Sequence, residues 1–293
     1  MSPWSDIERS IAAATTMPFR IESRVPVGGG CINAAFRIAG SGRTYFVKTN
    51  APPAADVFAA EAAGLAEIAQ SQTVRVPPPL CQGCNAKASW LVLEWIEFGS
   101  ARRDGSCALG QALAAMHRTT APRFGWHRDN TIGATPQVNT QGSDWPEFWR
   151  ERRLGFQFAL AAKNGAPPSL HAKGDRLARD FAVLLKGCAV KPALLHGDLW
   201  GGNVGFTSSG VPVIFDPAVY YGHREADLAM TELFGGFSAD FYAAYHEAFP
   251  LDAGYGVRKH LYNLYHVINH YNLFRGGYAR QAETMIDRLL AEI

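Results

Sequence analysis

One short segment, LLHGDLWGGNVGF at residues 194–206, constrains this chain more than any other feature. An apolar run leads into His196, Asp198 and Asn203, which stand in the pattern H-x-D-x-x-x-x-N. In that spacing the aspartate acts as a base and the asparagine as a metal ligand. Further along the chain the β-type run VIFD ends at Asp216, where a second metal ligand would belong. The segment therefore predicts metal-assisted phosphoryl chemistry.

Three further polar features precede this segment in the order that phosphoryl transfer from ATP requires. A glycine turn at Gly28, Gly29 and Gly30 comes first, Lys48 follows on a β-type run, and Glu61 lies on the next predicted helix. Glycines let backbone amides approach phosphate oxygens, a lysine neutralises their charge, and a helix glutamate holds the lysine in place. The order of these residues independently supports the same chemistry.

The predicted secondary structure divides the chain near residue 98. Residues 1–98 are β-rich with one inserted helix, and the runs AAFRIA and TYFVKT form a predicted hairpin. Residues 99–293 are mainly helical, with amphipathic stretches such as DRLARDFAVLLKG. Residues 121–143 show no clear periodicity and are expected to be a loop. We therefore expect an α+β fold with a small nucleotide-binding lobe, residues 1–98, and a larger catalytic and substrate lobe, residues 99–293.

Composition excludes several other functional classes. The 28 basic and 26 acidic residues are mixed along the chain, without the basic block of a nucleic-acid-binding protein. No window reaches 18 consecutive apolar residues, and the acidic start of the chain does not fit a signal peptide. The five cysteines, an odd number, favour a reducing compartment. We expect a cytoplasmic protein without nucleic-acid or membrane partners.

The longer strings around these residues resemble the fructosamine kinase (ketosamine-3-kinase) family. The resemblance extends from about residue 20 to residue 275 and includes VGGGCINAAF, FVKTN, HGDLWGGN, FDPAVYYGHREADLAMTELFGGF and LYNLYHVINHYNLF. At Gly201 many members have serine, a small departure that we do not expect to remove activity. The resemblance implies a two-lobed protein-kinase-like fold, shared with aminoglycoside and choline kinases.

This resemblance also implies a reaction. The family transfers the γ-phosphate of ATP, with Mg²⁺, to the 3-hydroxyl of a ketosamine, the sugar adduct that glycation leaves on free or protein-bound amines. The phosphorylated adduct is unstable and releases the amine, so a glycated protein is deglycated. Members of bacterial type are expected to favour ribulosamines and erythrulosamines over fructosamines.

The matched motifs assign roles to individual residues. Asp198 would be the base, Asn203 and Asp216 would bind Mg²⁺, and Lys48 paired with Glu61 would position the α- and β-phosphates.

Four further positions carry weaker assignments. LVLEWIEF resembles the hinge, where backbone groups of Glu94 and Ile96 would contact adenine. Trp200 either packs the lobe or lines the sugar site. Cys31 directly follows the glycine turn, and the resemblance suggests a thiol that can oxidise, link two protomers and suppress activity. The expected state is a monomer or a redox-dependent homodimer.

Several other polar residues have structural interpretations. We expect His196 to orient its loop and Asp227 in READLAM to rigidify that loop as a buried cap. Glu67 lies on the same predicted helix as Glu61 and stays an alternative partner for Lys48. Two further spacings resemble metal or redox motifs but lack further ligands. Cys81 and Cys84 fall near a predicted strand end and are not expected to bind a metal, and His266 and His270 are expected to be core or groove residues of an aromatic helix.

Two other functions remain open. A small-molecule kinase of the aminoglycoside, choline or homoserine type would share H-x-D-x-x-x-x-N but not the long strings. A non-catalytic nucleotide-binding pseudokinase would lack turnover, although every expected catalytic group is present here. A protein kinase is disfavoured because Pro217 and Ala218, not Phe and Gly, follow Asp216, and no A-P-E triplet follows.

Overall fold

The computed structural model describes residues 3–28 and 32–293, and the chain divides into two compact units. One unit comprises residues 1–105 and 202–217, and the other comprises residues 106–201 and 218–293. Residues 202–217 join the first unit through isolated β-bridges from Phe98 to Thr207 and from Arg75 to Val213. The division of the sequence into two lobes at residue 98 stays a prediction. The contacts in the structure group one later segment, residues 202–217, with the first unit.

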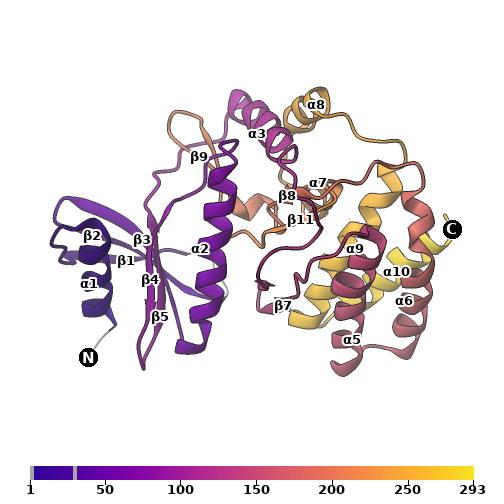
Figure 1. Ribbon diagram of the computed structural model, residues 1–293, viewed down its shortest axis with the longest axis horizontal. Helices are drawn as coiled ribbons and strands as arrows, with labels where there is room; N and C mark the ends of the chain where they lie inside the picture. Colours follow the sequence, from indigo (N-terminus) through magenta and orange to yellow (C-terminus); the bar gives the residue numbers. More distant parts are fainter. Residues whose placement is uncertain (1–2, 29–31) are drawn as a thin grey trace. The chain divides into compact units, whose positions relative to one another are not determined.

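The first unit is built on a five-stranded antiparallel sheet with strand order β1-β2-β3-β5-β4. Helices α1 and α2 lie on opposite faces of this sheet (Figure 1). The predicted hairpin is confirmed as β2 and β3. The elements are α1 (Trp4–Thr15), β1 (Ser23–Pro26), β2 (Ala34–Gly40), β3 (Arg43–Asn50), α2 (Ala55–Gln70), β4 (Pro79–Cys84), β5 (Ser89–Glu94), β9 (Val204–Phe206) and β10 (Pro212–Ile214).

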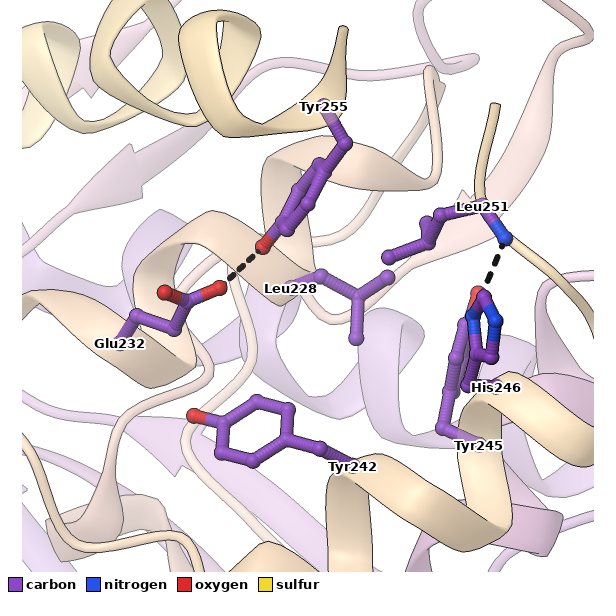
Figure 2. A pocket seen from close by; sticks show the side chains of 7 residues that line it. All are labelled: Leu228, Glu232, Tyr242, Tyr245, His246, Leu251 and Tyr255. Atoms are coloured by element: carbon purple, nitrogen blue, oxygen red, sulfur yellow. Dashed lines mark hydrogen bonds between the residues drawn. The ribbon is translucent and has the colours of Figure 1, made fainter. Parts of the chain in front are cut away.

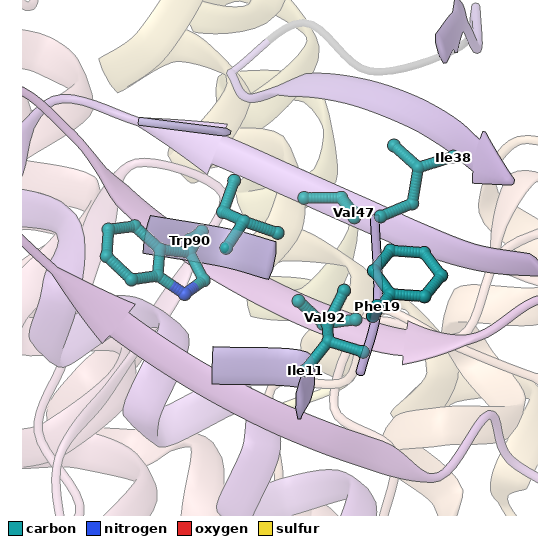
Figure 3. Close-up of a cluster of buried hydrophobic side chains, with 7 residues drawn as sticks. Ile11, Phe19, Ile38, Val47, Trp90 and Val92 are labelled. Carbon is teal, nitrogen blue, oxygen red and sulfur yellow. The ribbon is translucent and has the colours of Figure 1, made fainter. Parts of the chain in front are cut away.

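Side-chain alternation along β3 gives the two faces of the sheet different roles. Val47 is fully buried in an apolar cluster with Ile11 of α1 and Val92 of β5 (Figure 3). Each buried side chain of this size contributes about 1.5–3 kcal/mol, and a register slip would expose the whole set. Successive strand residues point to opposite faces, so Lys48 lies on the α2 side. The core packing against α1 therefore fixes where Lys48 points.

The second unit is mainly helical, and none of the described helices is long and apolar enough to cross a membrane. Two predicted helix starts are capped by side chains: Asp144 accepts from the Glu147 N–H at 2.7 Å, and Ser238 accepts from the Phe241 N–H at 3.3 Å. Helix α3 (Arg103–Met116) runs into this unit, which also contains β6 (Asn130–Ile132), β7 (Thr135–Gln137), α4 (Trp145–Phe148), a π-helical segment (Trp149–Gly155), α5 (Phe156–Lys163), α6 (Pro168–Asp180), β8 (Ala193–Leu195), β11 (Tyr220–Gly222), α7 (Glu225–Leu233), α8 (Ala239–Ala248), α9 (Tyr255–Phe274) and α10 (Tyr278–Leu290).

The expectation of a loop at residues 121–143 is wrong for two short stretches, which form strands. The segment contains the antiparallel pair β6 and β7, and two of the three buried strand residues, Thr135 and Gln137, are polar, the third being Ile132. Gln137 and Asn139 are buried, and both donate hydrogen bonds to Asn130 Oδ1, at 2.8 and 2.9 Å. Hydrophobic periodicity detects strands that bury apolar side chains, so it could not reveal this one.

Candidate active site

Two carboxylates of the first unit, those of Glu61 and Asp216, contact the ammonium group of Lys48 on β3. Its Nζ donates to Glu61 Oε1 of α2 at 2.8 Å and also to Asp216 Oδ1. Lys48 is 6% exposed, whereas the Asp216 side chain is 45% exposed. The pairing expected from chain order is therefore present, and Glu61, of the two helix carboxylates considered, forms it.

The surroundings of Lys48 keep its ammonium charged. Burial alone would lower the pKa of Lys48, but the carboxylates of Glu61 and Asp216 more than offset burial and raise the pKa above its ordinary value. Lys48 is thus a fixed positive charge beside a partly exposed carboxylate. Such a charge, with few rotamers available to it, suits the binding of phosphate oxygens.

Asn203 and Asp216 flank the pair of short strands β9 and β10. The N–H of Phe215 donates to the Asn203 carbonyl at 3.1 Å, which brings the end of this strand pair back beside its beginning. Asp216 has a φ of 57°, in the left-handed region that aspartate adopts more readily than most residues. One carboxylate and one amide oxygen from adjacent backbone are hard donors of the kind that Mg²⁺ prefers, so these residues fit that ion.

The loop that carries Asp198 belongs to the second unit, where Asp227 of α7 holds its backbone. The N–H groups of His196 and Gly197 donate to the Asp227 carboxylate at 2.7 and 2.8 Å. Burial acts to raise the pKa of Asp227, but hydrogen bonds from His117 and from Gly197 hold it below its usual range. The N–H of Asp198 donates to His196 Nδ1 at 3.2 Å. These contacts agree with a rigidifying Asp227 and an orienting His196.

Asp227 is itself oriented by a buried chain of hydrogen bonds that sequence reasoning missed. A carboxylate only accepts, so His117 Nε2 donates to Asp227 Oδ2 at 3.2 Å, and His117 Nδ1 then accepts from the Tyr245 hydroxyl at 2.8 Å. Burial lowers the pKa of His117, in keeping with this neutral tautomer. Tyr245 also lines a cavity of about 320 Å³, with Leu228, Glu232, Tyr242, His246, Leu251 and Tyr255 (Figure 2).

Two glycines of the same loop differ in what they tolerate. Gly197 has a φ of 82°, and a Cβ added there would lie 2.1 Å from the Ala218 carbonyl oxygen. A Cβ added at Gly201 would lie 3.6 Å from its nearest neighbour, the Gly235 oxygen. Gly197 is therefore required by the backbone, whereas Gly201 has room for a serine side chain.

We expect Gly197→Ala to lower the free energy of unfolding by about 2–4 kcal/mol, because it combines backbone strain with a steric clash. We expect Gly201→Ser to stay within about 0.5 kcal/mol of wild type. Thermal unfolding and turnover of the two variants, measured side by side, check both values. Equal behaviour of the two variants would contradict the difference in local space.

Among the other predicted site residues, Trp200 contacts the same loop through its backbone N–H, which donates to the Asp198 carbonyl at 3.2 Å. Trp200 is 39% exposed, and Gly28 is exposed, with no described atom within 4 Å of a Cβ added to it. The described chain therefore does not itself require glycine at position 28. Gly29, Gly30 and Cys31 lie outside the described residues.

The hinge-like segment, residues 91–98, begins within β5, and Glu94 is the last residue of that strand. The Glu94 N–H donates to the Pro78 carbonyl at 3.0 Å, and its side chain accepts from Arg75 at 2.9 Å. Ile96 is buried. A contact of Glu94 with a base would therefore use its carbonyl oxygen.

The two short motifs lie on β4 and on α9. Cys81 pairs with Val92 and Cys84 with Ser89 across β4 and β5, so the two thiols point to opposite faces of the sheet. Burial raises the pKa of Cys81 to about 11, which makes it a poor nucleophile and metal ligand. On α9 the His270 ring lies 4.9 Å from the ring of Phe234, and His266 is buried.

A cluster in the second unit has the composition of a metal site, namely Cys188, His223 and Glu225. Its groups already have protein partners. Trp145 Nε1 donates to the Tyr262 hydroxyl at 3.2 Å, so that hydroxyl donates to His223 Nδ1 at 2.6 Å and leaves the proton of His223 on Nε2. Glu225 accepts two hydrogen bonds of 2.7 Å from Arg258. The cluster is a satisfied structural network.

Lys48 on a five-stranded sheet pairs with Glu61 of the following helix, and an H-x-D-x-x-x-x-N segment follows later in the chain. Together these features define the protein-kinase-like class. A crystal structure of an aminoglycoside phosphotransferase matches with a TM-score of 0.62 at 13% identity, covering 97% of this chain and 98% of that one. The predicted two-lobed α+β fold is thereby confirmed. The sequence model of the fructosamine kinase family matches residues 3–292, and the chain belongs to that family.

Individual relatives agree with this assignment. A probable ketoamine kinase of Synechocystis is 48% identical, covering 99% of this chain and 97% of its own. The chloroplastic protein-ribulosamine 3-kinase of Arabidopsis thaliana is 44% identical, covering 90% of this chain and 81% of its own. The crystal structure of a fructosamine-3-kinase candidate from Haemophilus somnus has a TM-score of 0.90 at 27% identity and covers 98% of this chain and 97% of that one.

Proposed function

We propose that the protein transfers the γ-phosphoryl group of ATP to the 3-hydroxyl of ketosamines on small molecules or proteins. The observation that carries this proposal is the buried Lys48, held by Glu61 and Asp216 in a member of the fructosamine kinase family. Aminoglycoside and choline kinases share the class of fold but not this membership. A pseudokinase is disfavoured because the charged groups that phosphoryl transfer needs are present and paired.

In this proposal the first unit binds the nucleotide. Lys48 contacts the α- and β-phosphates, backbone amides at Gly28 to Gly30 approach the phosphates, and the Glu94 carbonyl and Ile96 N–H meet adenine. Asn203 and Asp216 hold Mg²⁺, which when bound neutralises charge on the phosphate oxygens. The preformed Lys48–Glu61 pair reduces the cost of organising this site when the nucleotide binds.

The loop of the second unit supplies the base. Asp198 accepts or orients the proton of the sugar 3-hydroxyl, and the Asp227 contacts to His196 and Gly197 hold its backbone in place. Trp200, partly exposed and two residues from the base, is the proposed wall of the sugar site. Oxidation of Cys31 and a cytoplasmic location stay predictions from the sequence.

The test is ADP release with Mg-ATP and a panel of acceptors: ribulose-lysine, fructose-lysine, kanamycin, choline and homoserine. We expect turnover on the ketosamines only, with an effective acceptor specificity of at least about 100-fold over the other alcohols, because buried polar groups reject acceptors that leave them unpaired. Turnover on kanamycin or choline instead would support a small-molecule kinase but would contradict ketosamines as its substrates. Nucleotide binding without turnover on any acceptor would favour the pseudokinase.

A further inference from the structure

A buried side-chain amide joins three segments of the second unit that are distant in sequence. Gln137 of β7 is 1% exposed, and its Nε2 donates to the Ala218 carbonyl at 3.1 Å. The Ala218 N–H donates in turn to the His196 carbonyl at 2.8 Å. Ala218 follows Asp216 by two residues, and His196 precedes Asp198 by two residues. The amide thus connects to both sequence neighbourhoods that carry the proposed chemistry.

The orientation of this amide is determined by its partners. The Ala218 carbonyl can only accept, so Nε2 and not Oε1 faces it. The second Nε2 hydrogen goes to Asn130 Oδ1 at 2.8 Å, and Oε1 accepts from the Tyr265 hydroxyl at 2.8 Å. Both hydrogens and the oxygen of Gln137 are therefore used. A fully satisfied buried amide specifies one geometry, because any rotation leaves buried groups unpaired.

The neighbouring contacts leave little freedom for the Ala218 peptide. Its carbonyl oxygen lies so close to Gly197 that a Cβ at that glycine would be 2.1 Å away. The next carbonyl, that of Val219, accepts from Asn130 Nδ2 at 2.8 Å. The Ala218 peptide is therefore held from the Gln137 side by hydrogen bonds and from the loop side by steric contact.

We propose that Gln137 is a positioning residue for phosphoryl transfer, which acts by fixing the Ala218 peptide and through it the loop that carries Asp198. This inference rests on the proposed function for its kinetic readout only. The hydrogen bonds from the Gln137 amide to Ala218 and from Ala218 to His196 are properties of the fold and can be followed without turnover.

Gln137→Glu and Gln137→Met test the role of the donated hydrogen. Methionine is close in volume and donates nothing, so we expect kcat to fall about 100-fold at every pH, with KM for Mg-ATP within about threefold. A protonated glutamic acid can still donate to Ala218, whereas its carboxylate cannot. We expect Gln137→Glu to lose about 100-fold in kcat at pH 8.5 and to recover at least tenfold by pH 6.

The sign of this pH dependence follows from the groups around the new carboxyl. Burial disfavours its charged form, and so do the two acceptors that it would face, the Ala218 carbonyl and Asn130 Oδ1. Two groups favour the charged form of the carboxyl: the Tyr265 hydroxyl and the Arg153 guanidinium. The guanidinium lies over the rings of Tyr220 and Tyr265. These opposing groups set the pH at which the new carboxyl is half-protonated. Only its protonated form can donate to the Ala218 carbonyl, so the activity of Gln137→Glu falls as the pH rises.

Gln157→Glu is the matched control. Gln157 is another buried glutamine of the same unit, and its side chain forms hydrogen bonds with Asn269 and Asn272 rather than with Ala218. It therefore buries the same carboxyl without breaking the bond under test. Kinetics are measured per folded molecule, with the folded fraction taken from circular dichroism at each pH.

Hydrogen exchange of the Ala218 amide gives a readout independent of turnover. We expect exchange in Gln137→Met to be at least tenfold faster than in wild type and Gln157→Glu to match wild type. Unchanged Ala218 exchange, or a kcat of Gln137→Met within threefold of wild type, would overturn the inference, as would equal pH profiles for the two glutamate variants. If wild type turns over no ketosamine, the proposed function fails while the exchange measurement still decides the role of Gln137.

Discussion

Replacement of Asp198 by asparagine should lower kcat about 1,000-fold and leave the affinity for Mg-ADP within about twofold. An amide is nearly the same size as a carboxylate, but it cannot accept the proton of the acceptor hydroxyl. The backbone of the loop is held by Asp227 through His196 and Gly197, and these contacts do not involve the Asp198 side chain. The change should therefore remove chemistry without removing structure.

Steady-state ADP release with ribulose-lysine measures the loss of turnover, and calorimetric titration with Mg-ADP measures binding. Asp175→Asn is a suitable control, because Asp175 is an exposed carboxylate of α6 that lies 3.7 Å from His171 Nε2. Nucleotide affinity that falls in parallel with turnover would show that Asp198 acts on the nucleotide instead of the acceptor. Retained turnover would remove Asp198 from the role of base.

The parts of this site that could be predicted from the sequence depend on local order. Lys48 follows a glycine turn and precedes a helix, and this order alone led to the expected contact with Glu61, with Glu67 of the same helix as the alternative. The caps at Asp144 and Ser238 are equally local, since each partner lies three residues away. The fold class followed from the same order of elements.

The parts that could not be predicted are contacts between distant polar residues. His117 lies 110 residues from Asp227 and 128 from Tyr245, and Gln137 lies 81 residues from Ala218. Amides, hydroxyls and imidazoles in such a chain look like ordinary loop or helix residues until the fold brings them together. Apolar periodicity carries no information about which buried polar group satisfies another. The hairpin at residues 121–143 was missed for this reason.

The second large effect concerns the ion pair of the first unit. Lys48→Met should lower the free energy of unfolding by about 3–5 kcal/mol, because it leaves the Glu61 carboxylate buried without its cation. The Glu61 side chain is 10% exposed, whereas Asp216 can reach water. The same substitution should lower kcat at least about 100-fold, through loss of the charge proposed to contact the phosphates. Denaturant unfolding and ADP release measure the two losses separately.

The double variant Lys48→Met with Glu61→Gln separates stability from catalysis. A neutral amide opposite methionine removes the unpaired charge, so most of the lost stability should return while turnover stays low. Burial raises the pKa of Glu61, and removal of Lys48 takes away the main opposing effect. In the single variant the stability deficit should therefore shrink as the pH falls and Glu61 becomes protonated. A deficit independent of pH, or turnover restored in the double variant, would show that Lys48 serves the fold alone and not the nucleotide.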